Sequence, residues 1–119
     1  MKHYLAVFLG HPGAFEKWMQ MDEPKRKALE KQGMEAWHAW VEKHASAIVD
    51  GGGPLSRTKR IDSAGITDVR NLLSGYTVVK ADSQEAAAKM FVGHPHFTIF
   101  PGEAVEVMEV LPIPEKPKR

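Results

Sequence analysis

Three histidines and two carboxylates are the side chains of this 119-residue sequence whose types and positions suggest chemistry. His44 follows Trp37 and Trp40 at helical spacing, so one face of a helix would carry both tryptophans and the histidine. A histidine titrates near neutrality and can give or take a proton. Asp50 lies just beyond the histidine, and Glu106 interrupts an apolar stretch near the end of the chain. The pattern indicates an acid–base pair in which His44 works with Asp50 or Glu106.

Each of these residues also has a structural interpretation. His44 could be a core histidine whose ring nitrogen meets a backbone carbonyl, and Asp50 stands before three glycines, where local turn chemistry is common. Glu106 could form an ion pair with a basic side chain instead of serving as a base. Trp37 and Trp40 could line a ligand pocket, or they could simply pack in the core.

The remaining two candidates, His94 and His96, flank a proline in the stretch FVGHPHFTIF. In an extended segment, residues two apart share a side, so both rings could reach one metal ion. No third ligand has a diagnostic spacing, and Pro95 cannot continue a helix. We therefore interpret this segment as the end of a helix with a ring at the mouth of a ligand pocket. We predict no metal and no cofactor.

Composition excludes several classes of protein. There are no cysteines, so disulfides, thiolate nucleophiles and cysteine–zinc sites are excluded. Sixteen basic and fifteen acidic residues nearly cancel, which gives no field that favours nucleic acid or a membrane as partner. No apolar run approaches the length of a transmembrane helix. The sequence predicts a cytoplasmic protein.

The elements that must position these residues follow the order β-α-β-β-α-β. This is the order of an α+β, ferredoxin-like fold with an antiparallel sheet and both helices on one face. We expect one domain over residues 1–114 and a flexible tail over 115–119. The expected strands are 3–9, 56–61, 75–81 and 104–111; the first helix starts at 22–24, carries its apolar stripe from Leu29 to Ile48 and ends at 50–54, and the second starts at 82–85 and ends at 93–95.

The first strand, 3–9, is apolar on both of its faces. Helices would cover only one face of the sheet, and a monomer seldom leaves so much contiguous apolar area in water. Two sheets packed face to face, as in a dimeric α/β barrel, would hide it. We therefore expect a homodimer that buries about 1,600 Å² in total. If Phe8 faces the partner, replacing it with Glu should disrupt the pairing.

Three stretches of the chain resemble the YCII-related family, including its DGPF branch. They are MEAWHAWVEKHASAIVDGGGPL (34–55), LLSGYTVVKADSQEAAAKMFVGHPHF (72–97) and EAVEVMEVLPI (103–113). The resemblance implies a dimeric α/β barrel built from ferredoxin-like subunits. It implies little about the reaction, although a few members resemble small lyases that act on ring compounds with a histidine and an acid as the working pair.

Pattern and resemblance together predict a protein that binds a small organic molecule in the cavity of a dimeric barrel. Lyase- or isomerase-type proton transfer by the histidine–acid pair would be its reaction. The alternative is a non-catalytic small-molecule-binding, regulatory or interaction module. The predicted pocket residues are Trp37, Trp40, His94 and His96.

Overall fold

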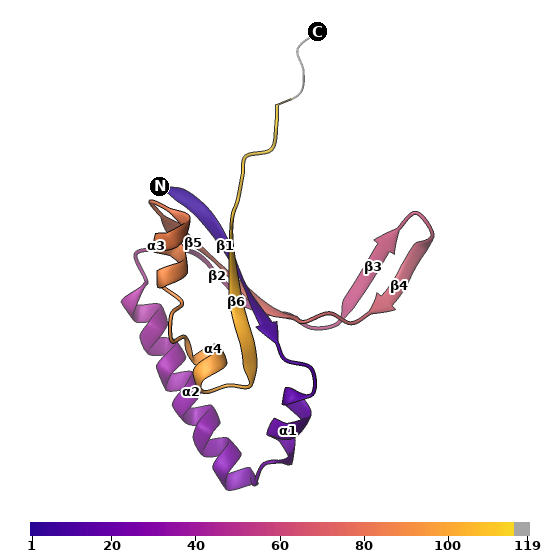
Figure 1. Cartoon of the computed structure of the whole chain (residues 1–119), viewed down its shortest axis with the longest axis vertical. Coiled ribbons are helices and arrows are strands. Elements are labelled where there is room, and N and C mark those ends of the chain that lie inside the picture. Colours follow the sequence, from indigo (N-terminus) through magenta and orange to yellow (C-terminus); the bar gives the residue numbers. More distant parts are fainter. Residues whose placement is uncertain (116–119) are drawn as a thin grey trace.

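The structure, a computed structural model that describes residues 1–115, contains a four-stranded antiparallel sheet with its helices on one side (Figure 1). The strand order in the sheet is β2-β5-β1-β6, and every neighbouring pair is antiparallel. This is the ferredoxin-like arrangement, so the predicted fold class is confirmed. In chain order the elements are β1 (Lys2–Gly10), α1 (Ala14–Gln20), α2 (Glu23–Lys43), β2 (Ile48–Pro54), β3 (Thr58–Asp62), β4 (Gly65–Val69), β5 (Leu73–Ala81), α3 (Gln84–Lys89), α4 (Pro95–Thr98) and β6 (Gly102–Glu109).

The side chains of strand β1 show how the two faces of the sheet differ, because successive side chains of a strand point to opposite sides. Tyr4, Ala6 and Phe8 are at most 4% exposed and form the core with the helices. The condition set for the Phe8→Glu test, that Phe8 faces a partner, is therefore not met, since its ring packs inside its own subunit. The alternate residues of β1, Leu5, Val7 and Leu9, lie on the other face, which we call the open face.

The open face continues across the two neighbouring strands. Leu5 pairs with Val78 and Met108, and Val7 pairs with Tyr76 and Glu106. All helices of residues 1–115 lie on the opposite side of the sheet (Figure 1). The apolar side chains of this face are therefore covered by no helix of the described chain.

A glycine of α2, Gly33, allows the segment before β6 to lie close against this helix. Gly33 is the buried residue of α2, and a Cβ atom there would lie 2.5 Å from the ring of Phe100. The absence of a side chain lets the Phe100 ring lie directly on the helix. The glycine in the apolar stripe, which costs about 1 kcal/mol of helix propensity relative to alanine, is thus explained by packing.

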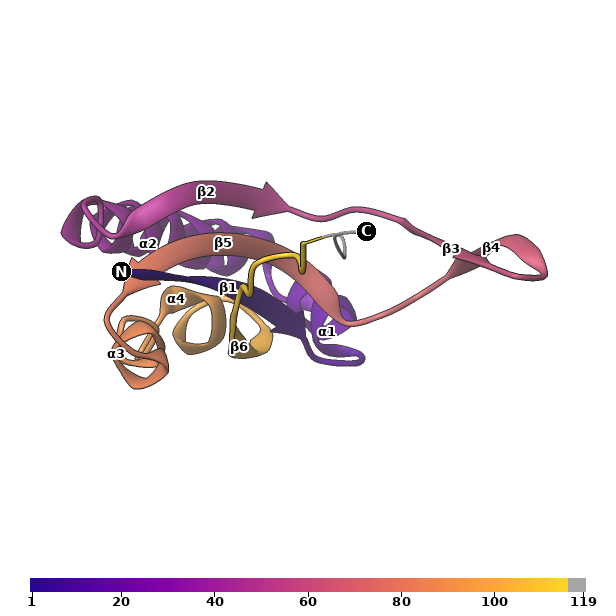
Figure 2. The same ribbon diagram turned by 90° about the horizontal axis from the view of Figure 1, so that it is seen from above.

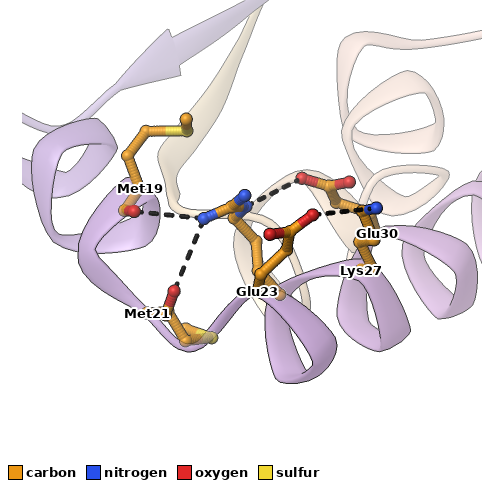
Figure 3. A network of polar contacts seen from close by, with 6 residues as sticks. Met19, Met21, Glu23, Lys27 and Glu30 are labelled. Carbon is orange, nitrogen blue, oxygen red and sulfur yellow. Dashed lines mark hydrogen bonds and ion pairs between the residues drawn. The ribbon is translucent and has the colours of Figure 1, made fainter.

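The turn between α1 and α2 is fixed by Arg26. Its Nη1 donates to the carbonyl oxygens of Met19, at 3.1 Å, and Met21, at 3.4 Å. Its Nε lies 3.7 Å from a carboxylate oxygen of Glu30, one turn further along α2. Figure 3 shows this network beside the neighbouring pair of Glu23 and Lys27. The side chain satisfies carbonyls at the end of α1 and sets the direction in which α2 leaves.

Helix α2, which corresponds to the first long helix expected from the sequence, ends earlier than predicted. It stops at Lys43, with His44 at its C-cap, and residues 48–54 form strand β2 instead of a terminating turn. The chain is held to the sheet because the Lys80 backbone N–H donates to the Ala47 carbonyl at 2.8 Å. Tertiary hydrogen bonding therefore overrides the apolar periodicity that continued to Ile48.

The segment 56–61, predicted as a strand of the main sheet, lies outside it. Thr58–Asp62 pairs with Gly65–Val69 to form a separate two-stranded hairpin, β3–β4. The hairpin projects from the side of the open face, away from the helices (Figures 1 and 2). The polar composition of this segment suits a strand that neither sheet face buries.

The segment around His94 also differs from the prediction. Helix α3 ends at Lys89, and Pro95 opens the short helix α4, for which His94 is the N-cap. Proline thus begins a helix, where its missing N–H costs nothing, and does not terminate the preceding one.

Within residues 1–115, no helix combines the length and apolar character needed to cross a membrane. Of the predicted tail 115–119, residues 116–119 lie outside the described part of the chain, and Glu115 belongs to no helix or strand. The division into a domain of 1–114 and a flexible tail stays a prediction.

Candidate functional site

A cleft of about 520 Å³ lies between α2 and the β2–β5 side of the sheet. Its volume falls within the range of about 300–1,000 Å³ typical of small-molecule pockets. We call it the α2 cleft. One wall is largely aromatic and the other is formed mainly by backbone and small residues. The aromatic side chains are Phe8, Trp37, Trp40 and Phe100, and the facing segments are Gly51–Pro54 and Ser74–Thr77.

The glycine-rich wall has an irregular backbone that hydrogen bonds hold in place. The Gly52 N–H donates to Oδ1 of Asp50 at 2.8 Å, and Thr77 Oγ1 donates to the carbonyls of Asp50 and Gly51 at 2.9 and 3.1 Å. Gly52 has φ of 64°, and a Cβ atom there would clash with the Tyr76 backbone. Gly51 and Gly53 have no such requirement, because a Cβ atom at either position would meet no atom within 4 Å.

His94 lies beneath the cleft, in the centre of the aromatic core. It is 1% exposed, and its ring is perpendicular to that of Trp37, with centroids 4.5 Å apart. The Trp40 ring lies 4.8 Å away, and the Phe8 ring 5.2 Å away. His94 Nδ1 accepts from the His96 N–H at 3.0 Å, while its Nε2 is buried without a hydrogen-bond partner. The neutral ring therefore carries its proton on Nε2, among aromatic faces that are weak acceptors.

His96 is buried and fixed to the sheet. Its Nε2 donates to the Leu9 carbonyl at 2.7 Å, and its ring occupies the space that a side chain at position 102 would need. Gly102 therefore makes room for the ring at the start of β6. Unlike His94, His96 also lines the α2 cleft.

Burial keeps these histidines neutral. Loss of solvation, followed by the positive charges that His96 and His44 would carry, lowers the pKa of His94 to about 4. Burial also lowers the pKa of His96, although its hydrogen bond to Leu9 opposes this. The pKa of His44 is lowered by burial and by the neighbouring charge of Lys43. At pH 7 the cluster is therefore uncharged.

The predicted pair of His44 and Asp50 is not joined by a hydrogen bond or ion pair within residues 1–115. The His44 ring packs on Trp40, with centroids 4.8 Å apart. The carboxylate of Asp50 is used locally by the Gly52 N–H, which matches the structural interpretation of that residue. Neither side chain lines the α2 cleft.

Glu106 lies on the open face of the sheet, opposite Val7 of β1. Its strand places it on the side away from the helices, so it does not meet the histidine cluster. The structure thus brings together four of the predicted residues and separates the three proposed for acid–base work. The four that meet are Trp37, Trp40, His94 and His96.

Sequence reasoning missed His38. Helical periodicity assigned it to the solvated side of the first helix, and its side chain is indeed exposed, yet it lines the α2 cleft. Met34, His38 and Val41 share one side of α2 and all line the cleft, so the cleft extends from the apolar stripe around the flank of the helix. The opposite wall is formed by β2, a strand in a place where the sequence pattern indicated the turn that ends the helix. Without that strand, nothing in the sequence indicated a cleft beside His38.

A second hollow of about 550 Å³ lies beside the edge strand β6, and we call it the β6 groove. It is bounded by α3, the start of α4 and β6. Its lining is mostly apolar, with Phe91, Val92 and Phe97 as the large side chains, and it includes the carboxylates of Glu85 and Glu103. No lysine or arginine belongs to this lining among residues 1–115.

No group of three or more potential metal ligands is close enough to hold an ion in the described part of the chain. Nδ1 of His94 accepts a hydrogen bond from the His96 backbone N–H, and Nε2 of His96 donates one to the Leu9 carbonyl, so each of these two ring nitrogens already has a protein partner.

No protein-family model matches the chain, and no curated protein matches it in sequence. Among solved structures, it is similar to the 5-chloro-2-hydroxyhydroquinone dehydrochlorinase of Burkholderia phenoliruptrix AC1100, solved in complex with 2,5-dihydroxybenzoquinone, with a TM-score of 0.53. The two sequences are 16% identical, and the match covers 89% of this chain and 90% of that chain. A likeness at this identity shows the fold, and it extends along nearly the whole chain.

Proposed function

We propose that this protein binds a small, flat organic molecule in the α2 cleft. The observation that carries the proposal is the form of the cleft, in which an aromatic wall faces a wall of glycine backbone. Aromatic side chains bind planar rings by stacking and edge contacts, and backbone without side chains leaves a narrow slot for a ring. The dehydrochlorinase of similar fold was solved with a ring compound, which agrees with this class of ligand.

The polar groups of the cleft favour a neutral or anionic ligand. His38 and His96 line it, together with the hydroxyl-bearing Thr77, and no carboxylate does so among the described residues. A cationic ligand would lose its water without gaining a counter-charge, which is costly. A ring with hydroxyl or oxo substituents fits these groups.

Proton transfer of the lyase or isomerase type is the second candidate, and the presence of His38 at the cleft favours it. An exposed histidine beside a bound ring is suited to carry a proton to or from solvent. A role for His44 with Asp50 or Glu106 stays a prediction from the sequence. Binding without chemistry needs only the walls of the cleft, and it is therefore the function that we put first.

A homodimer formed through the open face is part of the proposal. Apolar side chains of three adjacent strands lie on that face, and a second sheet would remove them from water. The pairing would give the dimeric α/β barrel expected for a member of the YCII-related family, and that membership is likewise proposed. A cytoplasmic location stays a prediction. The apolar residues of the face are Leu5, Val7, Leu9, Tyr76, Val78 and Met108.

Titration with 2,5-dihydroxybenzoquinone tests the binding proposal, with the tryptophan indole N–H resonances as the readout. We expect the signals of Trp37 and Trp40 to shift, and that of Trp18, which does not line the cleft, to serve as the internal reference. Gly51→Leu should fill the cleft and weaken binding at least tenfold without unfolding the protein, because a side chain there has open space.

Val49→Leu is the matched control, because Val49 belongs to the same strand but does not line the α2 cleft. Equal affinity of Gly51→Leu and the wild type would contradict the location of the site. His38→Gln separates the two candidate functions, because glutamine keeps a hydrogen-bonding side chain at the cleft but cannot transfer a proton near neutral pH. It should weaken ring binding less than Gly51→Leu does and abolish any proton-transfer step.

A further inference from the structure

The β3–β4 hairpin extends away from the rest of the molecule (Figure 2). The hairpin and the segment that follows β6 both extend from the body (Figure 1). Together they account for a radius of gyration of 17.2 Å, whereas a compact chain of this length has about 13–14 Å. An isolated two-stranded hairpin is marginally stable in water, so contact with another surface would stabilise this one.

The tip of the hairpin is apolar. Ile61 and Ile66 are directly opposite one another, and they are 71% and 70% exposed. On the same face, Lys59 Nζ and Asp68 Oδ1 form an ion pair at 2.6 Å. Such an exposed ion pair contributes little to stability. Two isoleucines held side by side at the end of an arm thus leave a paired apolar surface exposed to water.

The β6 groove is a surface that the hairpin tip could fit. It is apolar, it is about 550 Å³ in volume, and its charged residues, Glu85 and Glu103, are both acidic. The hairpin and its flanks, residues 57–70, contain four basic and two acidic residues, a formal excess of two positive charges. The two surfaces are thus complementary in both apolar character and charge.

A hairpin cannot fill the groove of its own chain. In both views the hairpin lies at one end of the molecule and α3, which borders the groove, lies at the other (Figures 1 and 2). The hairpin leaves the body on the side of the open face, which is where a second subunit would lie in the proposed homodimer. The hairpin therefore extends towards the position that a partner subunit would occupy.

We propose that the β3–β4 hairpin is an exchanged arm, which seats Ile61 and Ile66 in the β6 groove of a second copy of this chain. The exchange is reciprocal in a two-fold dimer, so each subunit gives one arm and receives one. The inference rests on the proposed homodimer and adds to it a contact outside the open face.

Disulfide trapping between two single-cysteine variants tests the arm, and the cysteine-free sequence makes each introduced thiol unique. One variant carries Ile66→Cys. The other carries Val92→Cys, at a groove residue that is 79% exposed. After equimolar mixing and mild oxidation, we expect a 66–92 cross-linked heterodimer on a non-reducing gel. Because the thiols are on different chains, this product can only be intermolecular.

Met108→Cys is the matched control for the receiving surface, since Met108 is 40% exposed and lies on the open face. Cross-linking of position 66 to position 108 in place of 92 would show that the open face receives the arm, and it would overturn the proposal. Absence of any heterodimer with Val92→Cys would overturn it as well.

Sedimentation of the double variant Ile61→Thr/Ile66→Thr supplies the second measurement. Threonine keeps the preference for a strand, and the hairpin lies outside the core, so folding is preserved. We expect the dimer dissociation constant to rise at least tenfold. An unchanged constant would refute the arm while leaving the homodimer intact, whereas a monomeric wild type would refute both.

Discussion

The two faces of the sheet are built from the same strands and are similarly apolar, but they are completed in different ways. On the helix-covered face, Tyr4, Ala6 and Phe8 are at most 4% exposed. Leu5 and Val7 alternate with these residues and lie on the open face. No helix of the described chain covers that face (Figure 1). A strand that is apolar on both faces belongs between two layers, and this chain provides one of them.

The difference lies in what closes each face. The covered face is closed by aromatic rings and neutral histidines that fit together in one subunit, with His94 at their centre. The open face is mainly aliphatic, with Tyr76 as an aromatic residue and Glu106 as a charged one. Its completion by a second copy is our proposal. Core packing of the subunit and association of subunits should therefore respond to different substitutions on the same strand.

The largest effect is expected for Phe8→Glu on the covered face. Removing a buried phenylalanine side chain costs about 3–5 kcal/mol, and a carboxylate in its place adds the cost of burying a charge. We expect the variant to be unfolded at pH 7, with loss of the cooperative urea transition. A folded but monomeric variant would show that Phe8 faces a partner, and it would reverse the assignment of the two faces.

A smaller and different effect is expected for Val7→Glu on the open face. In the proposed dimer this change would bury a carboxylate next to Glu106, which lies opposite on β6. We expect the dimer dissociation constant to rise at least 100-fold, about 2.7 kcal/mol, with the far-UV circular dichroism of the folded subunit retained. Sedimentation over a range of concentrations provides the measurement.

Ala45→Glu is the control for this variant, because Ala45 is exposed just beyond the end of α2 and away from the open face. It introduces the same charge and should leave association unchanged. If Val7→Glu remains a dimer of wild-type affinity, the open face is not the interface.

Much of this arrangement could be predicted from the sequence. The alternation in residues 3–9 gave β1 two apolar faces, and the order of elements identified the ferredoxin-like fold. Strand β1 is recognisable because its side chains meet both layers, so its composition records them. The sequence could not decide which face the helices cover, since both alternating sets are apolar.

The end of the first helix and the start of β2 were harder to predict. The stripe that passes through Trp37 and Trp40 continues smoothly to Ile48, and three glycines after it resemble a terminating turn. The strand exists because β5 supplies hydrogen-bond partners, such as the Lys80 N–H for the Ala47 carbonyl. Local periodicity contains no information about a partner strand that lies more than thirty residues further along the chain.

The lack of information about distant partner strands also explains why the candidate site was predicted only in part. Helical spacing placed Trp37 and Trp40 on one face of a helix, and both line the α2 cleft and pack against the core. His38 was missed because the α2 cleft depends on where β2 lies, and β2 was placed incorrectly. His44 and Asp50 are close in sequence, but the change from helix to strand between them directs Asp50 to its own backbone.

The smallest of the three effects concerns pH and acts on the covered face. The pKa of His94 is lowered to about 4 by burial, and an unfolded histidine titrates near 6.5. Between these values the unfolded chain binds the proton and the folded chain does not. The stabilising contribution is therefore complete above pH 6.5 and is lost as the pH falls towards 4. From pH 7.5 to pH 5 the loss amounts to roughly 2 kcal/mol of unfolding free energy, which urea titrations at several pH values would measure.

His94→Phe distinguishes this mechanism from general acid destabilisation. Phenylalanine keeps a ring in the aromatic cluster and removes both the titration and the unpartnered Nε2. It also removes the acceptor for the His96 N–H, which costs about 1 kcal/mol. The variant should therefore be close to the wild type at pH 7.5 and more stable than it at pH 5. A variant that loses as much stability on acidification as the wild type would mean that His94 is not the titrating group. The sensitivity of the covered face to pH would then lie with His96 or His44, whose pKa values are also lowered.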